Sequence, residues 1–125
     1  MLQELVISSF RFLLNIGKLS WIYSFETVKS PFPKSTYNRN AEIYKILANP
    51  KRLEILNLLK NRELSVEQIV RVLKARKANV SQHLSLLRHS KLVKVRREGL
   101  NAFYTITNPK IVEPCKILHV LWRKR

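Results

Sequence analysis

Nine basic side chains lie between Gln68 and Arg97, and no acidic residue interrupts them over these thirty residues. They are Arg71, Lys74, Arg76, Lys77, Arg88, Lys91, Lys94, Arg96 and Arg97. Charges of one sign repel one another and destabilise a compact chain, so a folded surface normally mixes lysine and arginine with acids. The run therefore suggests a polyanionic partner.

The composition describes a folded and strongly cationic protein. The chain has 125 residues, 46% of them apolar, which is enough for one domain with a modest core. Its net charge is +16, and all eight acids are glutamate. Such an excess attracts nucleic acid or an anionic membrane. No stretch reaches the roughly 18–20 uninterrupted apolar residues of a spanning helix, so a membrane partner is not expected.

Cysteine usage and catalytic motifs narrow the class further. The single cysteine, Cys115, cannot form an intramolecular disulfide and fits the reducing cytoplasm, where we expect the protein. The chain has no aspartate, no glycine-rich phosphate loop and no nucleophile–base motif. Cys115 and His119 are the only candidate pair, on a helix that also carries apolar packing residues. We therefore expect no enzyme, no catalytic residues and no cofactor.

Two helices are predicted at the centre of the basic run. Ser65 and Gln68 have the spacing of a capping box, which starts the first helix. A four-residue connection, Lys74 to Lys77, leads into the second helix. The apolar stripes are Val66, Ile69, Val70 and Leu73 in the first helix, and Val80, Leu84 and Leu87 in the second. A helix, a short turn and a helix place the second helix in the major groove of DNA.

The flanking elements complete the predicted fold. Asn49-Pro50 and Asn108-Pro109 each supply an N-cap and a first helical residue for an earlier and a last helix, and Pro114 either kinks the last helix or marks its start. After Ser90 the apolar period becomes two, and Glu98-Gly99 turns a β-hairpin. The sequence thus predicts a mainly α fold with a small β-hairpin, a winged helix-turn-helix. We expect this DNA-binding and dimerisation domain over residues 41–121, followed by a basic tail at 122–125.

Residues 1–40 form an N-terminal extension of different character. Its apolar stripe is Leu2, Leu5, Val6, Phe10, Leu13 and Leu14, the pattern of an amphipathic helix. Pro31 and Pro33, together with Ser30, Ser35, Asn38 and Asn40, predict a linker after it. The helix could pack on the domain or its dimer partner, anchor the chain at a membrane surface, or belong to a disordered extension.

The second predicted helix defines the candidate DNA-reading face. With its apolar stripe inward, the opposite side presents Lys77, Ala78, Ser81, Gln82 and Ser85. Glutamine bonds adenine bidentately, serine bonds several bases, and lysine reaches guanine or phosphate. Asn79 and His83 flank this face, and His83 is equally compatible with a structural role.

Further cations surround that face. Arg88 and Lys91 are expected to contact phosphates, which position a protein without reading sequence. Arg96 and Arg97 of the hairpin are predicted to enter a minor groove or clamp the backbone. The alternative is that they protect a solvated edge strand by their charge.

Several stretches resemble the ArsR/SmtB family of repressors. They are LANPKRLEIL (47–56), ELSV (63–66), ANVSQHL (78–84), LLR (86–88), RREG (96–99) and Phe103-Tyr104. The resemblance covers about residues 41–121. It implies a homodimer formed by the first and last helices of the domain, a pseudo-palindromic DNA operator, and release of DNA by an inducer, which the sequence does not identify.

This chain departs from the family at its metal and turn positions. Ser65 replaces a thiolate ligand of the family, and soft metals need thiolates. Cys115 and His119 are two ligands, short of the four of a zinc site unless a symmetric dimer adds two more. We expect no metal site, and Cys115 is expected to be a small core residue. Lys74 and Arg76 stand where the family has a turn glycine and a serine N-cap, at a cost of about 1 kcal/mol each.

The sequence therefore favours a dimeric transcriptional repressor that binds a specific sequence of double-stranded DNA. We expect this repressor to lack the usual thiolate metal site of the family. The high charge keeps a second interpretation open, a nucleoid-associated or architectural protein with little sequence preference.

Overall fold

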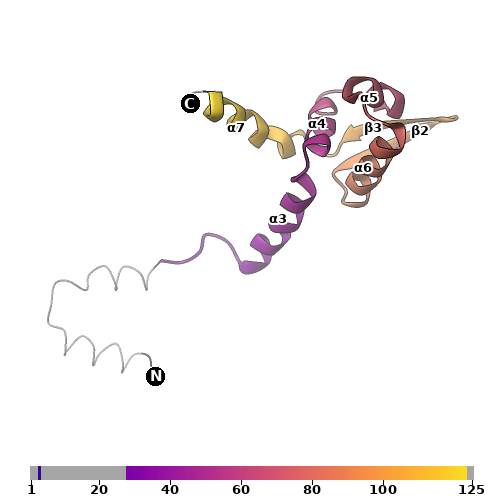
Figure 1. The fold of residues 1–125 in the computed structure, drawn as a ribbon. Coiled ribbons are helices and arrows are strands. Elements are labelled where there is room, and N and C mark those ends of the chain that lie inside the picture. The colour runs from indigo at the N-terminus through magenta and orange to yellow at the C-terminus, as the bar shows by residue number, and fades with distance from the viewer. Residues whose placement is uncertain (1–2, 4–27, 124–125) are drawn as a thin grey trace. The chain divides into compact units, whose positions relative to one another are not determined.

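The computed structural model describes Gln3 and residues 28–123 of a chain that divides into two compact units, Met1–Tyr37 and Asn38–Arg125 (Figure 1). The predicted N-terminal amphipathic helix lies outside these described residues. In the described end of the first unit, the Ser30 hydroxyl donates to the Tyr37 hydroxyl over 2.9 Å. The rings of Phe32 and Tyr37 meet edge to face with centroids 6.0 Å apart.

Helix α3 spans Lys34–Leu47 and so begins before residue 41, where the predicted domain starts. The linker prediction is therefore wrong for residues 34–40, which are helical. Serine, threonine and asparagine are only weak helix formers, at a few tenths of a kcal/mol each. No proline or glycine lies between Pro33 and the end of α3 at Leu47, so the helix that packs Ile43 and Ile46 on the core extends back to that proline.

Helix α4, Pro50–Leu58, starts as predicted. Asn49 is its N-cap, and the Asn49 side chain accepts from the backbone N–H of Arg52 over 3.1 Å. Pro50 occupies the first helical position, where a missing N–H costs no hydrogen bond. Ile55 and Leu56 are fully buried, so α4 is a core helix.

Helices α5, Val66–Leu73, and α6, Lys77–His89, form the predicted helix-turn-helix. The capping box is confirmed: the Ser65 hydroxyl accepts from the Gln68 N–H, and the Gln68 side chain accepts from the Ser65 N–H. The connection is one residue shorter than predicted, because Lys77 is already the first residue of α6. A left-handed backbone at Lys74 (φ 49°, ψ 40°) ends α5 at Leu73, as predicted.

The β-hairpin has a third strand that the sequence did not predict. Strands β2, Val93–Glu98, and β3, Asn101–Ile106, are antiparallel, and Gly99 begins the two-residue turn at φ +59°. Strand β1, Leu64–Ser65, pairs with the other edge of β3, giving the order β1-β3-β2. Two residues are too few to show an alternating pattern, so β1 carries no signal of its own.

The chain ends its described part in two helical segments. Asn108 caps a 3₁₀ helix, η1, at Pro109–Val112, by accepting from the Lys110 N–H over 3.0 Å. Helix α7 follows at Glu113–Arg123. Pro114 is its second residue, so this proline marks the start of a new helix.

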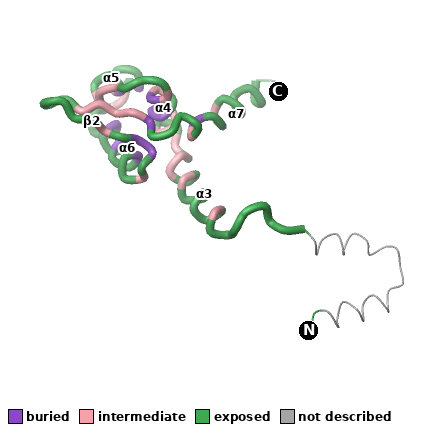
Figure 2. The backbone as a smooth tube through the Cα atoms, turned by 180° about the vertical axis from the view of Figure 1, so that it is seen from behind, coloured by how far each residue is buried: buried purple, intermediate pink, exposed green. Residues whose placement is uncertain are grey.

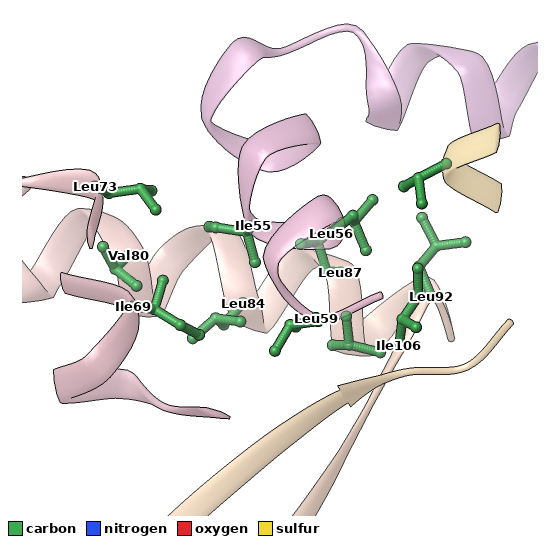
Figure 3. Close-up of a cluster of buried hydrophobic side chains, with 12 residues drawn as sticks. Ile55, Leu56, Leu59, Ile69, Leu73, Val80, Leu84, Leu87, Leu92 and Ile106 are labelled. Carbon is green, nitrogen blue, oxygen red and sulfur yellow. The ribbon is translucent and has the colours of Figure 1, made fainter. Parts of the chain in front are cut away.

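One apolar cluster holds α4, α5, α6, the sheet and η1 together (Figure 3). Its buried members are Ile55, Leu56, Leu59, Ile69, Leu73, Val80, Leu84, Leu87, Leu92, Val93, Ile106 and Val112. Among the described residues, no polar or charged side chain is buried with them. The helix-turn-helix and the hairpin are thus fixed to one another by shared packing.

Helix α6 ends in a Schellman motif whose left-handed residue is a lysine. The N–H of Leu92 donates to the Leu87 carbonyl, and the N–H of Lys91 donates to the Arg88 carbonyl, each over 2.9 Å. Lys91 has φ +60°, the conformation usually held by glycine at this position. Buried Leu92 and Leu87 supply the apolar contact of the motif, so packing holds Lys91 in a strained backbone.

We expect Lys91→Gly to raise the free energy of unfolding by about 0.5–1 kcal/mol. The gain from removing the left-handed Cβ clash, about 1–2 kcal/mol, exceeds the added freedom of glycine in the unfolded chain. Chemical denaturation would measure it. The matched control is Lys91→Ala, which removes the same charge but keeps the Cβ. If Lys91→Ala stabilised the protein as much as Lys91→Gly, charge rather than backbone strain would be the cause.

Candidate nucleic-acid interface

Helix α6 presents the face that the sequence predicts. Val80, Leu84 and Leu87 are each fully buried on its inner side. The other side is exposed at Lys77, Asn79, Ser81, Gln82 and Ser85. These side chains supply hydrogen-bond donors and acceptors of the kind that read base edges in a major groove. Their contact with bases stays a prediction.

The N-terminus of α6 is unusually basic and lacks a side-chain cap. Arg76 occupies the N-cap position without a capping hydrogen bond, as its side chain predicts. Lys77 Nζ lies 2.8 Å from Glu67 Oε1, so an ion pair spans the turn from α5 to α6. That hydrogen bond lowers the pKa of Glu67. Both side chains are more than half exposed, so the pair adds little stability and leaves Lys77 available to a phosphate.

His83 lies at the edge of the face and is half-buried. Desolvation lowers the pKa of His83 below 6.5, and the positive charges of Arg52 and Lys51 lower it further. His83 is therefore neutral near pH 7, with one ring nitrogen donating and the other accepting. The basic N-terminus of α4 also lies close enough to act on α6. The exposed Lys51 is a phosphate-contact candidate that the sequence did not reveal, because Lys51 precedes the basic run.

The lowered pKa of His83 makes stability depend on pH. Unfolding returns the pKa to about 6.5, so the unfolded chain binds more protons in acid, and this contribution destabilises the fold as pH falls below 6.5. An NMR titration of the His83 ring should give a midpoint below 6.5. In Lys51→Gln the midpoint should rise, because one repelling charge is gone. A midpoint at or above 6.5 in the native protein would contradict this account of its surroundings.

The remaining predicted cations differ in their surroundings. Arg88 is exposed in the last turn of α6, where a positive charge also favours the helix dipole. Arg97 is exposed in β2 and has no partner among the residues that the structure describes. Arg96 is bonded to Glu63 and Glu98, with N–O distances of 2.6 and 2.7 Å. Of the two arginines in the β2–β3 hairpin, which is the wing of the fold, only Arg97 has no ion-pair partner among the described residues.

Helix α7 is exposed along almost its whole length (Figure 2). Its exposed apolar side chains are Ile117, Leu118, Val120, Leu121 and Trp122. Cys115 is only half-buried and does not belong to the core cluster, so the prediction of a core cysteine is wrong. The reason is that α7 buries no residue against its own domain.

The described residues hold neither a cluster of metal ligands nor a spanning helix. In Gln3 and residues 28–123, no three histidine, cysteine or acidic side chains are grouped so that they could hold a metal ion. Over the same part of the chain, every helix is too short or too polar to cross a membrane.

The central part of this chain is similar to a known family of regulators. The model for bacterial regulatory proteins of the arsR family matches residues 49–95, from the N-cap of α4 into β2. The transcriptional repressor PagR of Bacillus anthracis is 43% identical over 81 residues, which are 64% of this chain and 81% of PagR. The transcriptional activator HlyU of Vibrio cholerae is 36% identical over 80 residues, 64% of this chain and 74% of HlyU.

Solved structures agree with these sequence matches. The homodimeric winged helix-turn-helix DNA-binding domain Mb0332 of Mycobacterium bovis, a fragment of residues 1–100 studied in solution, has a TM-score of 0.62 to this chain. It is 28% identical, and the match covers 79% of this chain and 92% of that one. The winged helix-turn-helix predicted from the sequence is therefore confirmed.

Proposed function

Because this chain belongs to the ArsR family of bacterial regulatory proteins, we propose that it is a dimeric repressor that recognises a specific double-stranded DNA sequence. The observation that carries the proposal is the placement of α6. Three fully buried side chains fix its inner side, and its outer side exposes polar groups beside a basic wing. This combination suits a helix inserted in a major groove.

The proposed contacts divide by chemistry. Gln82, Ser81 and Ser85 read base edges from the middle of α6, with Asn79 and His83 at the border of that face. Lys77 and Arg88, at the two ends of α6, bind phosphates and set the position of the helix. Arg97 contributes the free cation of the wing. Phosphate attraction supplies most of the affinity, and the α6 face supplies the specificity.

Dimerisation is proposed through α7, together with α3. The exposed apolar side of α7 needs a cover in water, and the related Mb0332 domain is homodimeric. A two-fold dimer places two α6 helices on half-sites about one helical turn apart, so we expect a pseudo-palindromic operator. The domain that dimerises and binds DNA is proposed to span residues 41–121, with 1–40 as an extension and 122–125 as a basic tail.

Repression without a thiolate metal site is the proposed mode of action. PagR, a repressor, shares more identical residues with this chain than the activator HlyU does. Ser65 stands where many family members have a thiolate ligand, and its hydroxyl caps α5. A hydroxyl is a poor ligand for a soft metal, so any inducer is expected to act elsewhere. A cytoplasmic location follows from the proposed role and from the single cysteine.

The test is fluorescence anisotropy of the reduced, metal-free protein on its own upstream DNA and on a shuffled copy, at near-physiological salt. A preference of about a hundredfold or more supports a specific regulator. Equal binding to both would require a scan of other promoters. If that scan were also flat, the net charge of +16 would be better explained by an architectural DNA-binding protein.

We expect Gln82→Ala to weaken binding to the cognate site by roughly 1–3 kcal/mol while hardly changing binding to random DNA. The reason is that a glutamine bonds one base and leaves the phosphate contacts intact. Arg97→Ala is the matched comparison, since it should weaken cognate and random DNA alike. If the ratio of cognate to random affinity stayed constant in Gln82→Ala, the reading face would be assigned wrongly.

A further inference from the structure

Arg96 and Arg97 are neighbours in β2, but their side chains lie on opposite faces of the sheet. Successive strand residues alternate, so Arg97 shares a face with Val93, two positions beyond Val95. Val93 is buried in the core. Arg96 shares the other face with its cross-strand partner Phe103. The two arginines therefore have different surroundings, although they look alike in the sequence.

The guanidinium of Arg96 is held from three sides. Its Nη2 and Nε donate to the two carboxylate oxygens of Glu63 over 2.6 and 3.2 Å. Its Nη1 donates to Glu98 Oε2 over 2.7 Å. Its central carbon lies 4.9 Å from the centroid of the Phe103 ring. This fork geometry, with two hydrogen bonds to one carboxylate, is the strong form of an arginine ion pair.

We propose that Arg96 is a positioning residue, which braces the wing against the segment that starts α5, and that Arg97 alone makes the wing contact with DNA. The inference rests on the proposed DNA-binding function. One cation and two carboxylates give the Glu63–Arg96–Glu98 triad a net charge of −1, so it offers no attraction to a phosphate. A phosphate that bound Arg96 would have to displace two carboxylates already in place.

The brace, meaning the bonds of Arg96 to Glu63 and Glu98, adds to the backbone pairing of β1 with β3 that already joins the hairpin to the start of α5. Glu63 immediately precedes β1, and Ser65 at the end of β1 is the N-cap of α5. Arg96 lies in the half of β2 toward the hairpin turn, where β2 residues are exposed. A bond from Arg96 to Glu63 therefore limits how far the wing can swing relative to the helix-turn-helix. Each exposed pair is weak alone, and the shared cation makes them a network.

The salt dependence of DNA binding separates a brace from a contact. Each phosphate contact contributes about 0.9 to the slope of log affinity against log salt. Arg97→Ala should reduce the slope by about 1. Arg96→Gln should leave the slope unchanged, because Arg97 can still reach its phosphate in the complex. It should still weaken cognate binding about 5- to 30-fold, the effect of a 1–2 kcal/mol change, because the freed wing must then be ordered on binding. A slope that fell in Arg96→Gln as in Arg97→Ala would overturn the proposal.

A double-mutant cycle tests whether Arg96 acts through Arg97. If the brace sets the position of Arg97, then Arg97→Ala should cost less affinity in the Arg96→Gln background than in the native protein. A general loss of stability would leave the cost of Arg97→Ala unchanged. Additive losses in the cycle would therefore contradict a positioning role for Arg96.

For Glu63→Gln, the brace predicts a change in DNA affinity opposite to the change that simple electrostatics predicts. Removing an acid near the interface should strengthen DNA binding if charge alone mattered. The brace predicts weaker cognate binding, because a neutral amide in place of the carboxylate cannot hold the guanidinium by a charged fork. Glu54→Gln is the control, with the same charge change at an exposed glutamate that has no ion pair among the described residues. If the Glu63→Gln variant bound cognate DNA as tightly as the Glu54→Gln variant, or more tightly, the proposal would be overturned.

Hydrogen exchange without DNA separates failure of the brace from failure of the proposed function. Amides of β2 and β3 near the turn should exchange faster in both Glu63→Gln and Arg96→Gln than in the native protein. If the protein bound no DNA but these amides were deprotected, the brace would stand and the proposed function would fail. Unchanged exchange in both variants would refute the brace whatever the protein binds.

Discussion

Leu84→Ala is expected to lower the free energy of unfolding by about 2–5 kcal/mol. Leu84 is fully buried in the middle of α6 and lies in the cluster with Ile55 of α4 and Ile69 of α5 (Figure 3). Truncation removes apolar contacts with both helices and leaves a cavity where three elements meet. Thermal unfolding should show the loss, at about 4–8 °C per kcal/mol for a domain of about 60–100 residues.

The neighbouring serine provides the control for this prediction. Ser85→Ala changes an exposed side chain on the same helix and should alter stability by no more than about 0.5 kcal/mol. Since α6 is held only by its buried side, Leu84→Ala should also weaken cognate DNA binding at temperatures near its lowered Tm, and cooling should restore it. A loss of stability below about 1 kcal/mol would mean that α6 is not fixed by this cluster.

Local signals in the sequence predicted the helix starts well. Asn49, Ser65 and Asn108 are all N-caps in the structure, because a cap is a contact between residues two or three positions apart. The buried stripe of α6 was also predicted correctly, since a helix buries residues at a fixed period. The start of α3 was not, because a run of weak helix formers can be overridden by the helix that follows it.

Contacts between distant residues could not be predicted. Strand β1 exists only because β3 pairs with it, and the Arg96–Glu63 bond joins residues 33 positions apart. A basic run shows that a surface is cationic, but it does not show which cations are already paired. For this reason Arg96 and Arg97 look equivalent in the sequence, while the structure distinguishes them.

An apolar stripe predicts that one side of a helix is buried, but it does not predict which surface covers that side. Helix α7 has the expected stripe, yet Leu118 remains 51% exposed and Leu121 59% exposed. The core of the domain is complete without them, since Val112 of η1 closes it. The stripe of α7 therefore remains exposed and is the surface that the proposed dimer would cover.

Leu121→Glu is expected to dissociate that dimer. Leu121 lies near the centre of the exposed stripe, one helical turn from both Ile117 and Leu118. Burying a leucine is worth about 1.5–3 kcal/mol, and a two-fold interface contains it twice, so the loss is about 3–6 kcal/mol. The dimer dissociation constant should rise roughly 10²- to 10⁴-fold. Analytical ultracentrifugation over a concentration series would measure it.

DNA binding should fall with the dimer, because a monomer engages one half-site instead of two. His119→Glu is the matched control: it also introduces one negative charge into α7, but by helical periodicity on the side away from Leu121. It should leave the dimer intact. If both variants stayed dimeric, the apolar side of α7 would not be the interface. If both dissociated equally, added charge rather than lost apolar contact would be responsible, and the result would not assign the interface to the apolar side of α7.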